Sequence, residues 1–254
     1  MYYSANMSQL TQRQIQILKC IVEEFIESAE AVGSENLERK HTLGCSSATI
    51  RSEMGALTTQ GFLKKSHSSA GRMPTSMGLK YYVRNLMTPK SMSISEEIGA
   101  KEKMWDYRNE FETLLKEATR ELARFTRTMA IATTEQGNIY YHGASNLLEQ
   151  PEFYDIDVTK AVLSLLDNQQ YWFDLIQRTL NVANEIHGDE EFVHLLIGED
   201  LGMQHLEPCG FVYQRYEAGP HRGIVGVVGP ARLSYTTVVP IVDYYADLIS
   251  TISH

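Results

Sequence analysis

The stretch SSATIRSEMGALTTQGFLKK, residues 46–65, decides the fold of the first part of the chain. A helix is expected over residues 47–60, because apolar side chains recur at the spacing of one helical face, at Ile50, Met54 and Leu57. Ser46 is placed to cap its start, and Gly61 suits the left-handed position that ends it. The opposite face presents Ser47, Thr49, Arg51 and Ser52.

Two further helices are expected before this one. Thr11 and Gln14 can form a capping box, and apolar residues then follow at spacings of three and four. This pattern predicts a helix from Gln12 to Ser28, and Ser34 is expected to cap a short second helix with Leu37 facing inward. Three short helices joined by tight turns indicate a helix-turn-helix, whose third helix enters the major groove of DNA.

A basic hairpin is expected after the third helix. Residues 62–65 suit a short strand, residues 66–71 a turn-rich tip and residues 72–74 the return strand, and Thr75 can cap a further helix through Met87. A helix-turn-helix followed by such a hairpin is a winged helix, with cations and neutral donors of the hairpin along the phosphates. The residues expected to contact DNA are Ser46, Ser47, Thr49, Arg51, Ser52, Lys64, Lys65, His67, Ser69, Gly71, Arg72 and Lys80.

Charge is distributed unevenly along the chain. The 254 residues carry a net charge of −9, and an acidic protein is repelled by phosphate. Residues 1–88, however, have a balance of +3, and residues 37–88 alone have +6, whereas residues 89–254 have −12. This asymmetry suggests one module that meets an anion and another that stays solvated or meets something else.

Length and composition limit the class of protein. A chain of 254 residues suggests two domains, or three, of ordinary size. Three widely spaced cysteines, Cys20, Cys45 and Cys209, argue against a disulfide scaffold and for a reducing cytoplasm. The sequence has no apolar run of about 18 residues and no signal-peptide pattern, so no membrane partner is expected.

The second half of the chain mixes strand and helix patterns. Strands are expected at residues 139–141, 192–197, 209–216 and 223–228, and helices at residues 156–166 and 171–180. A long closing helix is expected over residues 233–252, kinked or divided at Pro240. Antiparallel neighbours among mixed elements predict an α+β domain.

No catalytic or cofactor site is expected. The glycine repeat at Gly223, Gly226 and Gly229 falls inside an apolar strand, which favours close backbone packing over nucleotide binding. A polar cluster at His187, Asp189, Glu190 and His194 has no recognised ligand spacing and is expected to be a solvated loop.

Several blocks of the sequence resemble the HrcA family of heat-inducible transcription repressors. In the first 88 residues the similar blocks are residues 10–14, 32–34, 43–51, 53–54 and 69–75. In the second half they are residues 143–153, 226–235 and 242–248. The blocks of the first 88 residues, the block at residues 143–153 and the two last blocks form three groups in the family's order. Three groups in this order are far more specific than any one of them.

The resemblance implies a cytoplasmic, nucleoid-associated repressor of heat-shock and chaperone operons. Such a protein would bind double-stranded DNA at an inverted-repeat operator as a homodimer, and its activity would be modulated by the GroE chaperonin. The implied fold is α+β, with a winged helix-turn-helix over residues 1–88, a long linker helix over residues 89–130 and a truncated GAF-like domain over residues 131–254. The alternative is a ligand-sensing regulator whose GAF-like domain binds a small metabolite; an enzyme is not expected.

The chain also departs from the family pattern. It lacks the dimerisation domain that family members carry as an insertion, since residues 129–134 are followed almost immediately by residues 137–141. Glu35 stands where a basic residue is usual, and Ala31 replaces a proline. A dimer contact could then lie on the linker helix, where a heptad seam comprises Met104, Arg108, Phe111, Leu115, Ala118, Leu122 and Phe125. A helix that packs on the chain's own second domain would give nearly the same pattern.

Overall fold

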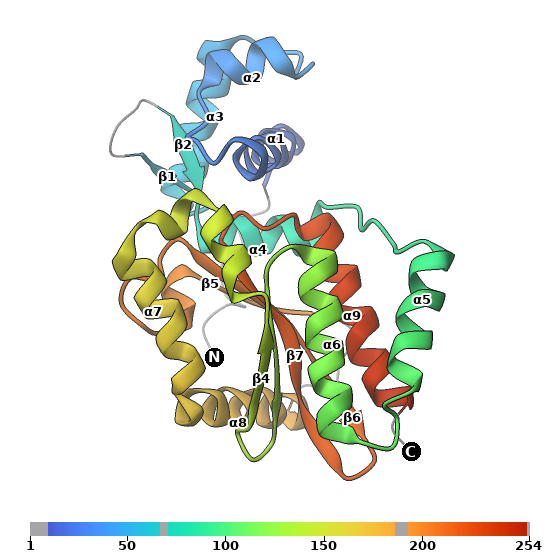
Figure 1. The fold of residues 1–254 in the computed structure, drawn as a ribbon. Helices are drawn as coiled ribbons and strands as arrows, with labels where there is room; N and C mark the ends of the chain where they lie inside the picture. The colour runs from blue at the N-terminus through green and yellow to red at the C-terminus, as the bar shows by residue number, and fades with distance from the viewer. Residues whose placement is uncertain (1–9, 67–70, 186–192, 253–254) are drawn as a thin grey trace. The chain divides into compact units, whose positions relative to one another are not determined.

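The computed structural model describes residues 10–66, 71–185 and 193–252. The chain divides into two compact units, residues 1–88 and residues 89–254. The first unit contains α1 (Gln12–Ser28), α2 (Ser34–Lys40), α3 (Ser47–Thr59), the hairpin strands β1 (Leu63–Lys65) and β2 (Arg72–Pro74), and α4 (Ser76–Asn85) (Figure 1).

Local sequence signals set the helix boundaries of the first unit. Thr11 and Gln14 form both hydrogen bonds of the capping box, and α1 has the expected bounds. Ser46 caps α3 by accepting a hydrogen bond from the Thr49 N–H. Ser34 does not cap α2, because Gly33 occupies the cap position and Ser34 is the first, buried residue of the helix.

The core of the first unit is formed by the apolar faces of its helices. Among the fully buried side chains are Ile17, Leu18, Ile21, Leu37, Ile50 and Leu57. Gly61 has φ +84°, which favours glycine, and lets the chain leave α3 and enter β1. Thr75 then caps α4, and its hydroxyl donates to the Gly61 carbonyl at 2.6 Å, which ties the two ends of the hairpin together.

The second unit is built on a five-stranded antiparallel sheet in the order β4-β3-β7-β6-β5. Its strands are β3 (Met129–Thr134), β4 (Ile139–His142), β5 (His194–Ile197), β6 (Cys209–Ala218) and β7 (His221–Pro230). Its helices are α5 (Ile94–Trp105), α6 (Phe111–Thr126), α7 (Ile156–Asp167), α8 (Gln169–Glu185) and α9 (Tyr235–Ile252), with short 3-10 helices η1 (Ala144–Glu149), η2 (Pro151–Tyr154) and η3 (Gly198–Leu201). The chain is therefore a mixed α+β protein.

Helices cover both faces of this sheet. α6 and α9 pack on one face, and α7 and α8 lie over the other (Figure 1). Trp172 of α8 is fully buried against Phe211 of β6, and its indole N–H donates to the Leu165 carbonyl at 2.6 Å. Aromatic and aliphatic side chains therefore fill the space between the sheet and these two helices.

The glycine repeat lies in β7 and serves close packing, as expected. A Cβ at Gly223 would lie 1.8 Å from the Thr133 carbonyl oxygen, and one at Gly226 would lie 2.2 Å from the Val212 carbonyl oxygen. Neighbouring backbone occupies the space that a side chain would need, so these glycines are part of the sheet.

The expected single linker helix over residues 89–130 is wrong. The chain forms two helices there, α5 and α6, separated at residues 106–110, and both belong to the second unit. Leu115, Ala118 and Leu122 of the proposed seam are fully buried, and α6 packs against α9 and β3. The heptad-like pattern therefore marks a helix that packs on its own unit.

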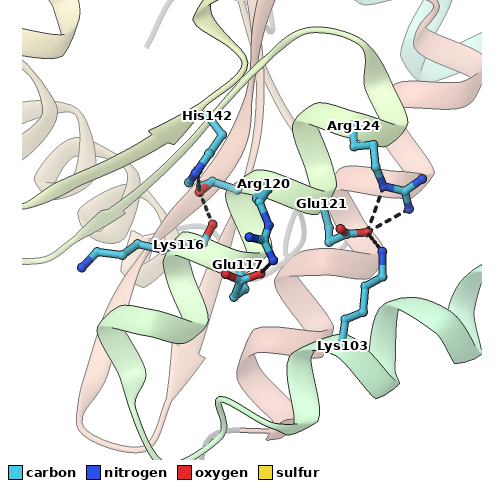
Figure 2. A network of polar contacts seen from close by, with 8 residues as sticks. Lys103, Lys116, Glu117, Arg120, Glu121, Arg124 and His142 are labelled. Carbon is cyan, nitrogen blue, oxygen red and sulfur yellow. Dashed lines mark hydrogen bonds and ion pairs between the residues drawn. The ribbon is translucent and has the colours of Figure 1, made fainter.

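A buried carboxylate ties α5 to α6 (Figure 2). Glu121 receives Lys103 of α5 at 2.6 Å and Arg124 of its own helix at 2.8 Å. Burial alone would raise the pKa of Glu121, but the hydrogen bonds from these two cations outweigh it and hold the pKa below its ordinary value.

Pro240 lies inside α9 without dividing it. A proline cannot donate to the carbonyl four residues earlier, here that of Thr236. The Lys90 N–H donates to this carbonyl at 2.7 Å instead. Of the two outcomes expected at Pro240, a kink or a division, the division is wrong: the helix continues, and a neighbouring segment supplies the donor for the exposed acceptor.

Candidate nucleic-acid interface

Helix α3 presents one polar face to solvent. Its apolar face is buried through Ile50, Met54 and Leu57, so the opposite side stays outward. Arg51 and Ser52 are exposed on this side. Side chains of these types can hydrogen-bond to base edges in the major groove.

The acidic residue of α3 is turned toward α1. Glu53 accepts a hydrogen bond from the Gln14 amide at 3.1 Å and lies 3.8 Å from the Arg13 guanidinium. These contacts draw the carboxylate away from the exposed end of α3 and pair part of its charge. The polar face around Arg51 is accordingly left without this acid.

The two hairpin lysines point to opposite faces. Lys64 pairs with Met73 and Lys65 with Arg72 in the β1–β2 ladder, and successive residues of a strand alternate between faces. Both lysines are exposed, but Lys65 shares its face with Arg72. A single phosphate path can therefore run past Lys65 without reaching Lys64.

A groove of about 490 Å³ joins α3 to the hairpin within the first unit. It is lined by Gly33, Ser34, Glu35, Arg51, Met54, Lys65, Gly71 and Arg72. Three cations from separate elements thus share one hollow, and Glu35 is the one acid among the lining residues. The Arg51 guanidinium lies 4.0 Å from the Glu35 carboxylate, and both side chains are mostly exposed, so this ion pair is weak.

Arg72 has a structural task as well as a charge. Its Nε donates to the Thr58 hydroxyl at 3.2 Å, and its backbone exchanges two hydrogen bonds of 2.9 Å with Val32. These contacts attach the hairpin to α3 and to the segment before α2. Thr58 and Val32 were not among the expected site residues, since neither carries a charge, and Val32 lies in a family-like block without a predicted role at the site.

The expected site residues fall into three groups. Those that line the groove are Arg51, Lys65, Gly71 and Arg72. Those that lie outside the groove's lining are Ser46, Ser47, Thr49, Ser52, Lys64 and Lys80. His67 and Ser69 lie outside the described residues.

A second buried carboxylate steadies α2 against α1. Glu24 receives the Lys40 ammonium at 2.6 Å and lies 3.0 Å from Nε2 of His41. The hydrogen bond from Lys40, aided by that from His41, holds the pKa of Glu24 below its ordinary value of 4.5. The C-terminal end of α2, the helix that carries Glu35, is therefore held against α1 by contacts that require Glu24 to be ionised.

Metal ligands do not cluster in the described part of the chain, where no group of three His, Cys, Asp or Glu could hold an ion. Of the polar cluster proposed from sequence, His187, Asp189 and Glu190 lie outside the described residues. No described helix has the length and apolar character to cross a membrane.

Comparison with known proteins gives consistent matches. The family model described as HrcA protein C terminal domain matches residues 90–239. The Heat-inducible transcription repressor HrcA of Ruminiclostridium cellulolyticum is 25% identical over 343 residues, covering 95% of this chain and 97% of the relative. That of Shouchella clausii is 24% identical over 335 residues, covering 92% and 95%. Both alignments are longer than this chain of 254 residues, so the relatives carry residues that it lacks.

A solved structure shares the fold. The protein described as "Crystal structure of a hypothetical protein at 2.2 A resolution" superposes with a TM-score of 0.71 at 19% identity. The match covers 96% of this chain and 97% of that one. At this identity the likeness concerns the fold alone.

Proposed function

Because the chain belongs to the HrcA family, we propose that it is a DNA-binding transcriptional repressor of heat-shock and chaperone operons. The first unit acts as a winged helix-turn-helix. α3 enters the major groove of an inverted-repeat operator, and the β1–β2 hairpin follows the phosphates. The protein acts as a homodimer in the cytoplasm, at the bacterial DNA.

The convergence of three cations in one groove carries this proposal. Arg51 comes from α3, and Lys65 and Arg72 come from the hairpin, so a base-reading helix and a phosphate-binding strand share one surface. The segment that holds them, residues 37–88, has a net charge of +6 in a chain of −9. A concentrated positive surface on an acidic protein suits a polyanion that must be bound at one place only.

The second unit is proposed to be a regulatory, GAF-like domain. Its five antiparallel strands with helices on both faces support this interpretation. Trp172, Phe211 and Ile176 fill the space between the sheet and α8, and a groove whose lining includes Gln136, Asn168 and Gln169 is open and lined mainly by polar side chains. This favours contact with another protein, such as the GroE chaperonin, over enclosure of a metabolite.

The proposal is tested by gel shift with the full chain. The probes are a duplex from upstream of a chaperone operon that carries an inverted repeat, and a duplex of equal length and composition with the repeat scrambled. We expect the repeat to be bound in clear preference at physiological salt, and the fraction of active repressor to rise when GroE and ATP are added. Equal binding to both duplexes contradicts the proposed repressor function. If the fraction of active repressor is the same with and without GroE, the proposed modulation by the chaperonin is contradicted.

A further inference from the structure

Strand β4 ends the sheet of the second unit. The strand order places it at one edge, beside β3, with α6 and α7 on either side (Figure 1). In the described part of the chain no further strand pairs with its outer side. Its sequence, Ile-Tyr-Tyr-His over residues 139–142, has high strand propensity.

The backbone groups that face outward can be assigned from the ladder. The Thr134 N–H donates to the Asn138 carbonyl at 3.0 Å, and hydrogen-bonded pairs alternate along antiparallel strands. Tyr140 and His142 therefore bond to β3, whereas Ile139 and Tyr141 direct their N–H and C=O groups away from the sheet.

Apart from its short length of four residues, this edge lacks the usual protection against pairing. Natural edge strands are commonly blunted by proline, by charged residues on the strand or by a bulge. β4 contains no proline, lysine, arginine or acid, and its register with β3 is unbroken. Tyr141 is 48% exposed, and a groove of about 500 Å³ runs beside residues 137–140.

We propose that two copies of this chain pair through β4 around a two-fold axis and form one continuous antiparallel sheet. The inference deepens the proposed function, on which it rests, because an inverted repeat is read by a two-fold dimer. In the register that uses both outward-facing residues, Ile139 lies opposite Tyr141 of the second copy, and Tyr140 lies on the axis. Four interchain backbone hydrogen bonds result.

The side chains suit this register. Ile139 and Tyr141 share one face of the sheet, so each isoleucine lies directly across from a tyrosine of the second copy. Aromatic and β-branched residues are favourable cross-strand partners. Ile139 already packs on the core beneath that face, which holds the pair in place.

Helix α6 supplies complementary charges. Burial, aided by the nearby Glu112 carboxylate, raises the pKa of Tyr140, and the Lys116 ammonium lies 5.7 Å from the Tyr140 ring centroid. The two charges thus flank Tyr140 along the helix. A two-fold axis at Tyr140 places Glu112 of one copy opposite Lys116 of the other, and the reverse.

The spacing of the helices fits as well. α6 packs over both β3 and β4, so two copies joined at β4 would hold their α6 axes about two strand spacings apart, or about 10 Å. Packed helices lie about 8–10 Å apart.

Lys116 is not drawn into the ion pairs that its own helix forms. Among the described ion pairs, Glu117 pairs with Arg120 and Glu121 pairs with Arg124, whereas Lys116 extends away from both pairs (Figure 2).

The test is sedimentation velocity on the full chain without DNA, at micromolar concentration. The wild type is expected to be a dimer. Tyr141→Pro removes an N–H that faces outward, and edge strands tolerate proline at such a position. We expect this variant to dimerise about tenfold more weakly or worse, with its circular dichroism unchanged. The matched control, Tyr141→Thr, keeps the N–H and is expected to weaken the dimer less.

Charge reversal gives a second test that does not alter the strand. Glu112→Lys and Lys116→Glu each place like charges across the axis and are expected to weaken the dimer, and the double reversal is expected to restore it. If Tyr141→Pro proves misfolded, these three variants decide the matter. A monomeric wild type, a Tyr141→Pro variant that is folded and fully dimeric, or a double reversal no better than the single ones overturns the proposal.

The proposed function can fail separately. A chain that dimerises through β4 but shows no preference for inverted-repeat DNA contradicts the repressor function alone. A chain that prefers such DNA while Tyr141→Pro leaves its dimer intact contradicts the β4 contact alone.

Discussion

Replacing Lys65 with alanine should change how DNA binding depends on salt, whereas replacing Lys64 should not. Lys65 lies on the groove side of the hairpin with Arg72, and Lys64 points to the other face. Each phosphate contact contributes about 0.9 to the slope of log affinity against log salt concentration. Between about 50 and 200 mM salt, a fourfold range, the affinity falls as salt is added. Losing one phosphate contact makes this fall about 3.5-fold smaller.

The assay is fluorescence anisotropy with a labelled duplex over that range of salt. The slope for Lys65→Ala is expected to be smaller than that of the wild type by about 0.9, on operator and on random duplex alike. Lys64→Ala is the matched control, since it removes the same charge from the adjacent residue, and should keep the wild-type slope. An unchanged slope for Lys65→Ala, or equal changes for both variants, would refute the assignment of the two faces.

Three further outcomes are expected. Glu35→Gln should raise affinity for any duplex by up to about fivefold in the same anisotropy assay. The substitution removes an acid from the groove and frees Arg51 from an exposed ion pair worth about 0.2–1 kcal/mol. Reduced affinity would show instead that Glu35 orients Arg51 for DNA. Thr58→Val should lower the free energy of unfolding in urea by about 0.5–1.5 kcal/mol, since the Arg72 Nε loses its acceptor; an unchanged midpoint would mean that the contact holds nothing. Because the pKa of Glu24 is lowered on folding, its stabilisation should be present above pH 4.5 and be lost as the pH falls through the lowered value. The free energy of unfolding of Glu24→Gln in urea should therefore depend less on pH in that range than that of the wild type. Identical pH profiles for the two proteins would contradict this role of Glu24.

The first unit could be predicted from sequence because its boundaries depend on local chemistry. The capping box at Thr11 and Gln14 determines where α1 begins, and the Ser46 cap and Gly61 determine where α3 begins and ends. The contact from Arg72 to Thr58 could not be predicted in this way, since it joins residues 14 positions apart through a hairpin fold.

The second unit was harder to predict because tertiary contacts decide its boundaries. Residues 106–110 contain no proline or glycine, yet the helix breaks there, and Phe111 restarts it while stacked 4.1 Å from His221 of β7. Leu115 and Leu122 follow a heptad spacing that fits a dimer seam or a core helix equally well, and their burial decides for the core. Continuity of α9 through Pro240 depends on a donor from Lys90, which sequence distance conceals.

The most direct test of the proposed repressor is a selection by the full chain from a library of randomised duplexes. The proposal predicts enrichment of an inverted repeat with two similar half-sites. It also predicts loss of that enrichment in Arg51→Ala, because a bidentate arginine contact to a base contributes about 1–3 kcal/mol of discrimination. Enrichment of no sequence, or the same enrichment with Arg51→Ala as with the wild type, would contradict the assignment of α3 as the element that reads DNA.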